Sequence, residues 1–127
     1  MYVYTIGIYT YSQFLSMDGK NRLEDLKKQV EDLSHDLGNH DFAIHGTVWK
    51  HYMKCGNVRC KCHENPPILH GPYYDWSRKI RMKTVNIRLS KEQAGIIEGW
   101  IQNMKRLENK LLEIEAISIR AAELIRK

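Results

Sequence analysis

The stretch "HYMKCGNVRCKCHENPPILHGPYYDW", residues 51–76, decides the fold because it contains all three cysteines of the chain and three of its six histidines. The cysteines, at positions 55, 60 and 62, follow the spacing Cys-x4-Cys-x-Cys. An odd number of cysteines does not complete a disulfide framework. Three interpretations are then open for these cysteines: a metal site, a redox centre, or small buried core residues.

The cysteine spacing favours the metal site. Zinc prefers four thiolate or imidazole donors in a tetrahedron. Cys60 and Cys62 are two residues apart, so on an extended chain both sulfurs project to the same face. Cys55 precedes Gly56-Asn57, a pair that tolerates positive φ and predicts a tight turn aiming backbone N–H groups at the Cys55 sulfur.

Two histidines can supply the fourth donor. His70 follows the loop "ENPPIL", which is stiffened by two prolines, and His63 is adjacent to Cys62. We prefer His70, because a ligand adjacent to Cys62 would strain the chelate. The predicted zinc ligands are therefore Cys55, Cys60, Cys62 and His70.

The same segment predicts a structural rather than a catalytic ion. A catalytic zinc keeps a water in its fourth position and needs a nearby acid or base. Glu64 and Asp75 are the only acidic residues between positions 44 and 90, and four donors are already present. The sequence shows no nucleophile–base pair and no glycine-rich phosphate loop, so we expect structural Zn²⁺ and no enzymatic activity.

The N-terminal part predicts an amphipathic helix at residues 21–38. Asn21 can cap it and Glu24, three residues on, completes a capping box. One apolar stripe follows at spacings of three and four: Leu23, Leu26, Val30, Leu33 and Leu37. Residues 1–16 are rich in Tyr and Thr and predict either a β-strand or a disordered tail, and residues 1–20 form a variable extension.

The middle of the chain, residues 44–90, predicts a small antiparallel β module. The stretch "GTVWKHYM" at 46–53 indicates one strand, and "PYYDWSR" and "KTVNIRLS" indicate a hairpin. In the last of these, apolar and polar side chains alternate, so one face is buried and the other is wet. The turn near residues 79–83 has no Asn-Gly or Asp-Gly pair, which leaves its register open.

A long helix is predicted at residues 91–127, where Ser90 opens the capping box "SKEQ". Its apolar positions repeat every seven residues, which indicates a coiled-coil seam or a long antiparallel helix pair. The predicted seam contains Ile97, Trp100, Met104, Leu107, Leu111, Ile114, Ser118, Ala121 and Ile125. The expected fold class is α+β: a zinc-stapled β element flanked by an N-terminal helix and this coiled-coil-like helix.

Charge is concentrated in the β module. The chain has a net charge of +5, and residues 44–90 alone hold nine Lys and Arg against two acidic residues. Such an excess is compatible with a nucleic-acid partner. The candidate phosphate contacts are Lys50, Lys54, Arg59, Lys61, Arg78, Lys79, Arg81, Lys83 and Arg88. Tyr73, Tyr74 and Trp76 lie among them and are candidates for base stacking, although alternate aromatics are equally expected to pack on the helices.

The pattern also resembles a known family. The stretch "KCGNVRCKCHENPPILHGPYYDWSRKIRMKTVNIRLS" is similar to short uncharacterised bacterial and archaeal proteins, often encoded near mobile elements, with a Cys-Gly-x3-Cys-x-Cys motif and a following His-Gly-Pro-Tyr motif. The resemblance covers roughly residues 44–115. It implies a small zinc-binding module and no particular activity.

Two functions follow from these features. The first is a non-catalytic zinc module that binds DNA or RNA through a basic β face. The second is a protein-interaction or assembly module, in which zinc stabilises the fold and residues 97–125 pair with a second copy or a partner helix. We expect a soluble protein of the reducing cytoplasm, with no membrane partner and no small-molecule substrate, since the sequence carries no evident signal peptide or membrane span.

Overall fold

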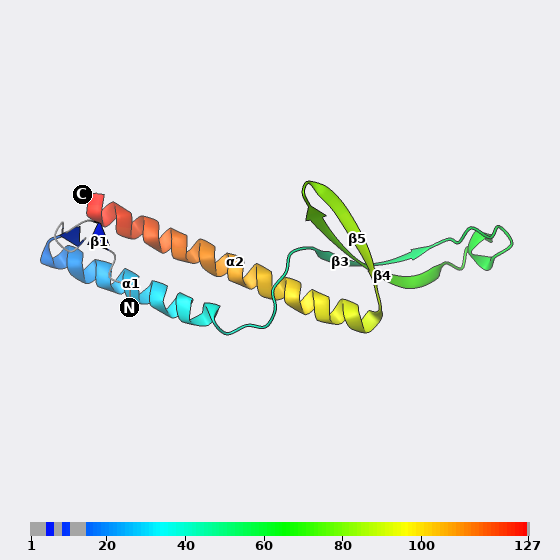
Figure 1. Cartoon of the computed structure of the whole chain (residues 1–127), viewed down its shortest axis with the longest axis horizontal. Helices are drawn as coiled ribbons and strands as arrows, with labels where there is room; N and C mark the ends of the chain where they lie inside the picture. The colour runs from blue at the N-terminus through cyan, green and yellow to red at the C-terminus, as the bar shows by residue number, and fades with distance from the viewer. Residues whose placement is uncertain (1–4, 7–8, 11–14, 127) are drawn as a thin grey trace. The chain divides into compact units, whose positions relative to one another are not determined.

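The computed structural model describes residues 5–6, 9–10 and 15–126 and confirms the α+β class (Figure 1). An N-terminal helix, a three-stranded antiparallel sheet and a long C-terminal helix follow one another along the chain. The elements are β1 (Thr5–Ile6), β2 (Tyr9–Thr10), α1 (Met17–Leu37), β3 (Thr47–Met53), the 3-10 turn η2 (Lys61–His63), β4 (His70–Ile80), β5 (Lys83–Leu89) and α2 (Lys91–Arg126).

Contacts group these elements into two units. The helical unit contains the chain up to His40 together with the chain from Arg106 onward, and the sheet unit contains residues 41–105. The long helix α2 therefore contributes to both units. Within residues 1–16, β1 and β2 pair antiparallel, and the rest of the predicted strand or tail before Leu15 lies outside the described residues.

Helix α1 begins four residues before its predicted start. Its cap is Ser16, whose Oγ accepts a hydrogen bond of 3.1 Å from the Gly19 amide, so Asn21 does not cap it. Asp18 in the first turn favours this start, because a carboxylate there interacts well with the helix dipole. The predicted apolar stripe is confirmed: Leu23 and Leu26 are buried, and Val30, Leu33 and Leu37 are half-buried.

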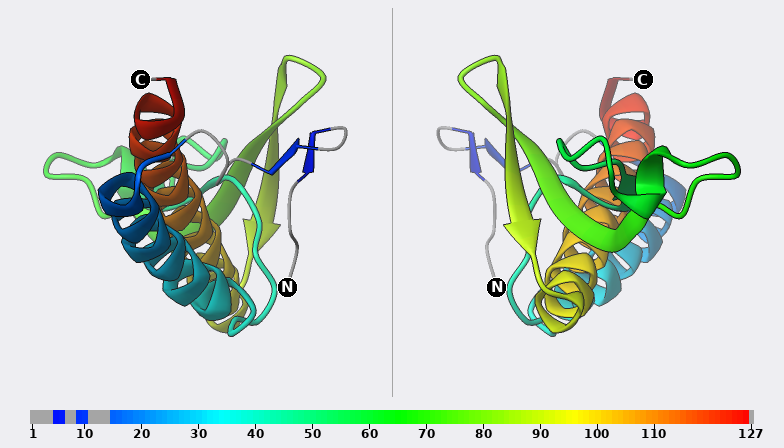
Figure 2. Two further views of the ribbon diagram at one scale, coloured as in Figure 1. Left: turned by 90° about the vertical axis from the view of Figure 1, so that its left-hand side faces the viewer. Right: turned by 90° about the vertical axis from the view of Figure 1, so that its right-hand side faces the viewer.

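In the helical unit, residues 106–126 of α2 run antiparallel beside α1 (Figures 1 and 2). Lys110 Nζ lies 3.1 Å from Asp36 Oδ2, and Arg106 donates to the Asn39 carbonyl at 3.4 Å. The predicted seam is wrong at two positions, since Leu111 and Ser118 are exposed while Lys110 and Ile117 are half-buried. The half-buried stripe of α2 therefore includes Lys110, which pairs with Asp36 of α1, and does not follow a strict seven-residue repeat.

The sheet unit is built on a three-stranded antiparallel sheet of order β3-β4-β5, which confirms the predicted β module. Thr47 to His51 of β3 pair with Ser77 to Tyr73 of β4, and Tyr74 to Ile80 of β4 pair with Leu89 to Lys83 of β5. The β4–β5 turn is a two-residue turn in which Arg81 and Met82 have φ of 49° and 69°. Positive φ at both central residues is the pattern of a type I′ turn. This turn forms here without the glycine or asparagine that such turns usually contain.

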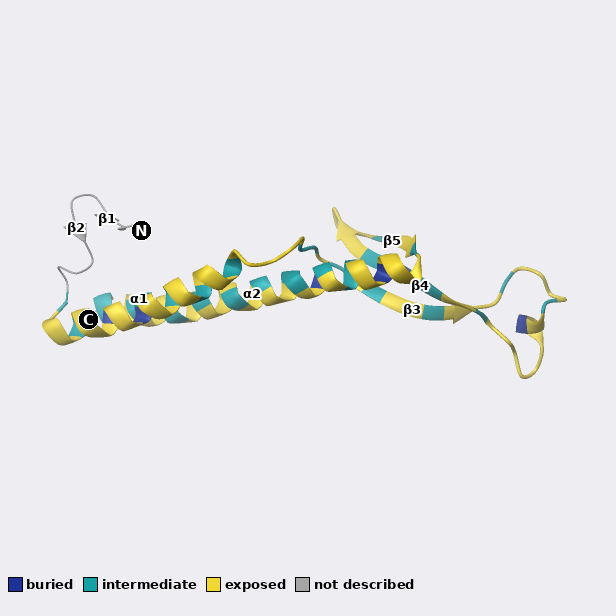
Figure 3. Ribbon diagram, turned by 90° about the horizontal axis from the view of Figure 1, so that it is seen from below, coloured by how far each residue is buried: buried dark blue, intermediate teal, exposed yellow. Residues whose placement is uncertain are grey.

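The register assigns each strand residue to one of two faces. Val48, Tyr74, Trp76, Val85 and Leu89 share an apolar face and are all half-buried, whereas Thr47, Trp49, Lys79, Asn86 and Arg88 share the opposite face and are exposed. We call the second one the open face. Figure 3 shows that the most buried stretch of the sheet is the middle of β4, where residues 73–77 are all half-buried or buried.

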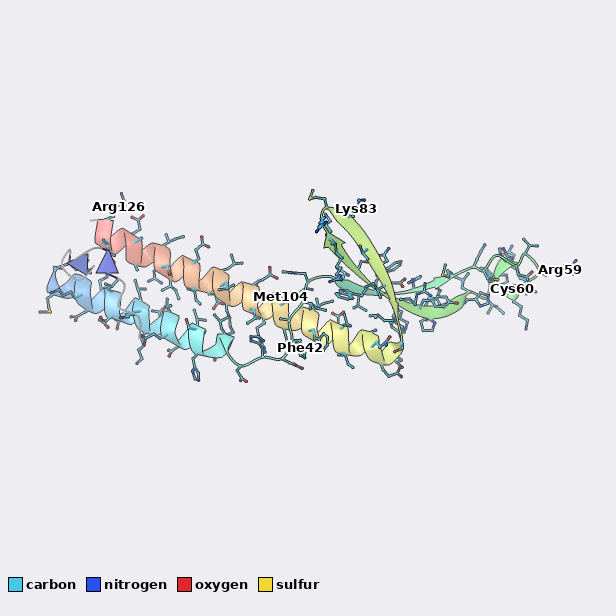
Figure 4. The ribbon with its side chains drawn as sticks, in the orientation of Figure 1. Phe42, Arg59, Cys60, Lys83, Met104 and Arg126 are labelled. Atoms are coloured by element: carbon cyan, nitrogen blue, oxygen red, sulfur yellow. The ribbon has the colours of Figure 1, made fainter. Side chains whose placement is uncertain are left out.

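The first turns of α2 complete the core of the sheet unit. Ser90 caps α2 as predicted: its Oγ accepts from the Gln93 amide at 3.1 Å, and its own amide donates to the Gln93 side chain at 2.9 Å. Ala94 and Ile101 are buried, and Trp100 packs edge-on against Phe42 with ring centroids 5.0 Å apart. Figure 4 labels Met104 on α2 and Phe42 next to this helix, both well beyond its first turn. No helix among the described residues is long and apolar enough to cross a bilayer.

Candidate metal centre and basic surface

The three cysteines lie in a loop that connects β3 to β4, residues 54–69, which we call the metal loop. It carries little apolar core of its own. Cys62 is its one buried side chain, while Val58, Ile68 and Leu69 are exposed. A loop with this burial needs another source of folding free energy, and a metal ion supplies it in many small domains.

The four predicted donors converge. Their ligand atoms, from Cys55, Cys60, Cys62 and His70, all lie within 4.8 Å of one another. The Cys55 and Cys62 sulfurs are 3.6 Å apart, and Cys60 Sγ lies 3.2 Å from His70 Nε2. Bond lengths of ~2.3 Å to sulfur and ~2.0 Å to nitrogen give tetrahedron edges of about 3.5 to 3.8 Å. The donor set therefore fits a structural zinc ion that would staple the β element.

Backbone amides of the loop point at the sulfurs of Cys60 and Cys62, whereas Cys55 Sγ donates to the Asn57 carbonyl instead of accepting from the expected amides. The Cys55 amide donates to Cys62 Sγ at 3.3 Å. A hydrogen bond from the Cys62 amide, helped by one to the Cys62 side chain, lowers the pKa of Cys60 to about 6. Burial instead raises the pKa of Cys62. Amides that point at a sulfur favour the thiolate, the form in which cysteine binds a metal.

Two local expectations about this loop are wrong. Cys60 and Cys62 do not sit on an extended strand, because residues 61–63 form a 3-10 turn in which the His63 amide donates to the Cys60 carbonyl at 3.0 Å. The tight turn predicted at Gly56-Asn57 is present, but without positive φ, since among the described glycines only Gly46 and Gly71 have it and Asn57 does not. The turn is made by Asn57, whose Oδ1 accepts from the Arg59 amide and whose carbonyl accepts from the Cys60 amide, both at 3.0 Å.

The structure also separates the two candidate histidines. His63 lies outside the donor cluster, and its Nε2 is 2.7 Å from the Cys55 carbonyl oxygen, to which it donates. His70 is the first residue of β4 and is paired with Met53 of β3. His63 thus ties the backbone of one ligand residue in place, and His70 supplies the fourth donor.

Gly71 explains how the strand delivers His70 to the cluster. It has φ of 131°, a conformation that side chains rarely adopt, and a β-carbon there would lie 2.9 Å from the His51 carbonyl oxygen. The pairing of β3 with β4 shifts register at the same point, between His51 and Met53. The sequence pair Gly71-Pro72, which lies within β4, therefore marks a close backbone approach beside the ligand.

All nine candidate phosphate contacts are exposed, but they do not form one face. Lys54, Arg59 and Lys61 belong to the metal loop. Lys50, Arg78 and Lys83 belong to the apolar face of the sheet, Lys79 and Arg88 belong to the open face, and Arg81 lies in the hairpin turn. Figure 4 shows Arg59 beside Cys60 at one end of the sheet unit and Lys83 at the tip of the β4–β5 hairpin.

The stacking candidates are divided in the same way. Tyr74 and Trp76 lie on the half-buried apolar face, where Trp76 Nε1 donates to the His45 carbonyl at 3.2 Å. Tyr73 lies on the open face with the Arg88 guanidinium 4.4 Å from its ring centroid. Sequence reasoning missed two aromatic neighbours on this face, Trp49 and His51. Their spacing of two in "VWKHY" was the available signal.

Fold and site together define a small α+β protein with a Cys3His metal-binding module. Residues 20–98 match the family described as a domain of unknown function, DUF6788, and the chain belongs to that family. The match includes most of α1, the metal loop, the whole three-stranded sheet and the first turns of α2. No curated protein and no solved structure matches the chain.

Proposed function

We propose that this protein is a non-catalytic zinc module whose sheet unit binds nucleic acid. The observation that carries the proposal is the exposed charge of residues 44–90. All nine of their Lys and Arg side chains are exposed, and Glu64 is the one exposed carboxylate. The other acid, Asp75, is buried and bonded to Arg88 at 2.7 Å.

The contrast with the helical unit supports this assignment. The sheet unit holds eleven Lys and Arg against five Asp and Glu, a net charge of +6, while the remaining residues hold nine against ten, a net charge of −1. A folded unit that concentrates positive charge attracts a polyanion and fits phosphate contacts that position a nucleic acid. The zinc would hold the basic metal loop in one conformation, which lowers the ordering cost of binding.

The test is the salt dependence of binding to a fluorescein-labelled oligonucleotide, measured by anisotropy. Each phosphate contact adds about −0.7 to the slope of log affinity against log salt for a single strand and about −0.9 for a duplex. The triple variant Lys54→Ala, Arg59→Ala, Lys61→Ala is expected to make the slope shallower by about 2. The matched control removes the same charge from the helical unit by Lys20→Ala, Lys28→Ala and Arg120→Ala. Equal slopes for the two triple variants, or no binding at low salt, would reject the proposal.

One observation favours a second function, an assembly module. Leu111, Leu112 and Ile119 of α2 are each more than half exposed. Apolar side chains of this size on one helix suit a second helix from another copy or from a partner protein, for example one encoded by a mobile element. Light scattering after size exclusion tests it, since Leu112→Glu with Ile119→Glu would dissociate a dimer formed there. A wild-type protein that is monomeric at high concentration excludes the homodimer.

A further inference from the structure

The open face of the sheet carries a row of planar side chains that play no part in the metal site. Trp49, the first side chain of this row, is 44% exposed. Its ring is stacked on His51, with ring centroids 4.1 Å apart and ring planes at 22°. The His51 ring lies 5.9 Å from the Tyr73 ring, and Arg88 lies over Tyr73. Four planar groups from three strands therefore follow one another across one face.

A buried carboxylate holds the middle members of this row of side chains in place. Asp75 is 7% exposed, and each of its oxygens has a partner: Oδ2 accepts from His51 Nε2, and Oδ1 accepts from Arg88 Nε at 2.7 Å. The Arg88 hydrogen bond, together with the one from His51, lowers the pKa of Asp75. An ionised Asp75 therefore holds the imidazole and the guanidinium in place at the same time, which restricts both side chains before any ligand arrives.

The exposed tryptophan is held as well. Trp49 Nε1 donates to Ser77 Oγ at 3.3 Å, and Ser77 is in turn bonded to Asn86 Oδ1 on β5. A large aromatic ring that is half in water would ordinarily move among rotamers. Here one edge is hydrogen-bonded and one face is stacked, while much of the ring stays accessible to a ligand. Such preorganisation lowers the entropic cost of binding a flat partner.

The charge of the open face selects the kind of partner. Its strand residues include the cations Lys79 and Arg88, and its one acid, Asp75, is buried and paired. Arg88 uses Nε for Asp75, so its side chain, 51% exposed, still offers the terminal nitrogens to an anion. Trp49 of β3 and Arg88 of β5 are both paired with Asp75 of β4, so they lie on one face with one strand between them. An accessible aromatic ring and an anchored guanidinium in this arrangement suit a ligand that alternates planar rings with anionic links.

We propose that the open face is a stacking platform for single-stranded nucleic acid, with a base on Trp49 and the adjacent phosphate on Arg88. This inference rests on the proposed function and specifies it. In a duplex the base faces are stacked on one another and unavailable to a side chain, whereas a single strand exposes them. The cations of the metal loop would contact either form, but Trp49 discriminates between them.

The experiment compares a labelled dT12 strand with a 12-base-pair duplex on the zinc-loaded full chain. Trp49→Leu keeps an apolar side chain and loses the aromatic face, so it is expected to weaken dT12 binding about tenfold, within the range measured for one stacked base. Its salt slope should equal that of the wild type, because no cation is removed, and duplex binding should not change. The triple variant of Lys54, Arg59 and Lys61 should instead weaken the binding of both the strand and the duplex, and it should make both salt slopes shallower.

A second variant guards against loss of folding. Trp49→Phe keeps a stacking ring, so it should bind dT12 within about threefold of wild type while losing most of the fluorescence quenching that dT12 causes, since Trp76 and Trp100 are half-buried. Salt-dependent binding with equal affinity for dT12 and duplex, or quenching that persists in Trp49→Phe, overturns the platform and leaves the proposed function intact. Absence of binding to both ligands overturns both.

Discussion

The two histidines of the metal loop offer the sharpest test of the metal centre. His70→Ala removes a donor atom, whereas His63→Ala removes a hydrogen bond of 2.7 Å to the Cys55 carbonyl and leaves the four donors in place. One hydrogen bond between neutral groups has a net value of about 1 kcal/mol. That corresponds to about fivefold in zinc affinity. Substitutions outside the ligand set cost up to about 100-fold, so loss of the His70 donor should exceed that.

Competition with a chromophoric zinc chelator, at one fixed pH and salt, measures both affinities. Cobalt substitution adds a spectroscopic readout: His63→Ala should keep the tetrahedral visible bands of a three-sulfur, one-nitrogen site, and His70→Ala should shift them. His35→Ala, an exposed histidine on α1, is the matched control and should change neither. The reasoning is refuted if His63→Ala loses as much affinity as His70→Ala, or if the bands shift in His63→Ala alone.

Three further predictions follow from the same geometry. Gly71→Ala forces a β-carbon to within 2.9 Å of the His51 carbonyl and should reduce zinc affinity at least ~10-fold by displacing His70, while Gly56→Ala, with no atom within 4 Å, should leave it unchanged. Met82→Gly should raise the free energy of unfolding by about 0.5 kcal/mol, because Met82 holds φ of 69° and is almost fully exposed; denaturant titration should show no such gain for Met82→Ala. Cys60→Ser should lose the metal and open the metal loop while far-ultraviolet circular dichroism retains most of its helical signal; full zinc content by elemental mass spectrometry would contradict the assigned site.

Periodicity and capping chemistry were enough to predict most of the architecture. The α1 stripe, the alternation in β5 and the Ser90–Gln93 capping box are local patterns, each decided by residues within four positions of one another. The predicted start of α1 was wrong because two capping signals compete within six residues. Ser16, with its hydrogen bond from the Gly19 amide, caps the helix in place of Asn21. Local reasoning cannot rank two caps that differ by a fraction of a kcal/mol.

The face of each basic residue could not be predicted, since it depends on strand register. The β4–β5 turn uses Arg81 and Met82 at positive φ, so the sequence carries none of the turn residues that would have fixed the register. A shift of one residue would exchange Lys79 and Arg78 between faces. The network of side chains on the open face could not be predicted for the same reason. Trp49, Asp75 and Arg88 come together only through the pairing of three strands.

The four metal donors were easier to predict from the sequence than the faces of the sheet. Three cysteines within eight residues limit the ligand set whatever the loop geometry, so the prediction survived two errors about backbone conformation. The 3-10 turn at residues 61–63 brings the sulfurs together by a different route from the extended chain first expected. Ligand identity was thus more robust than the local structure that was used to argue for it.

The division of α2 between the two units has a consequence for synthesis on the ribosome. The 65 residues from 41 to 105 separate α1 from the part of α2 that covers it. At about 5 to 20 residues per second, the leucines of α1 wait roughly 3 to 13 s for their partner after α1 has been made. An amphipathic protein helix such as α1, with 21 residues, takes most of its stability from tertiary packing of its apolar face. The sheet unit, which is continuous in sequence, can fold and take up its ion during that interval, while the apolar stripe of α1 stays uncovered until the chain from Arg106 onward has been made.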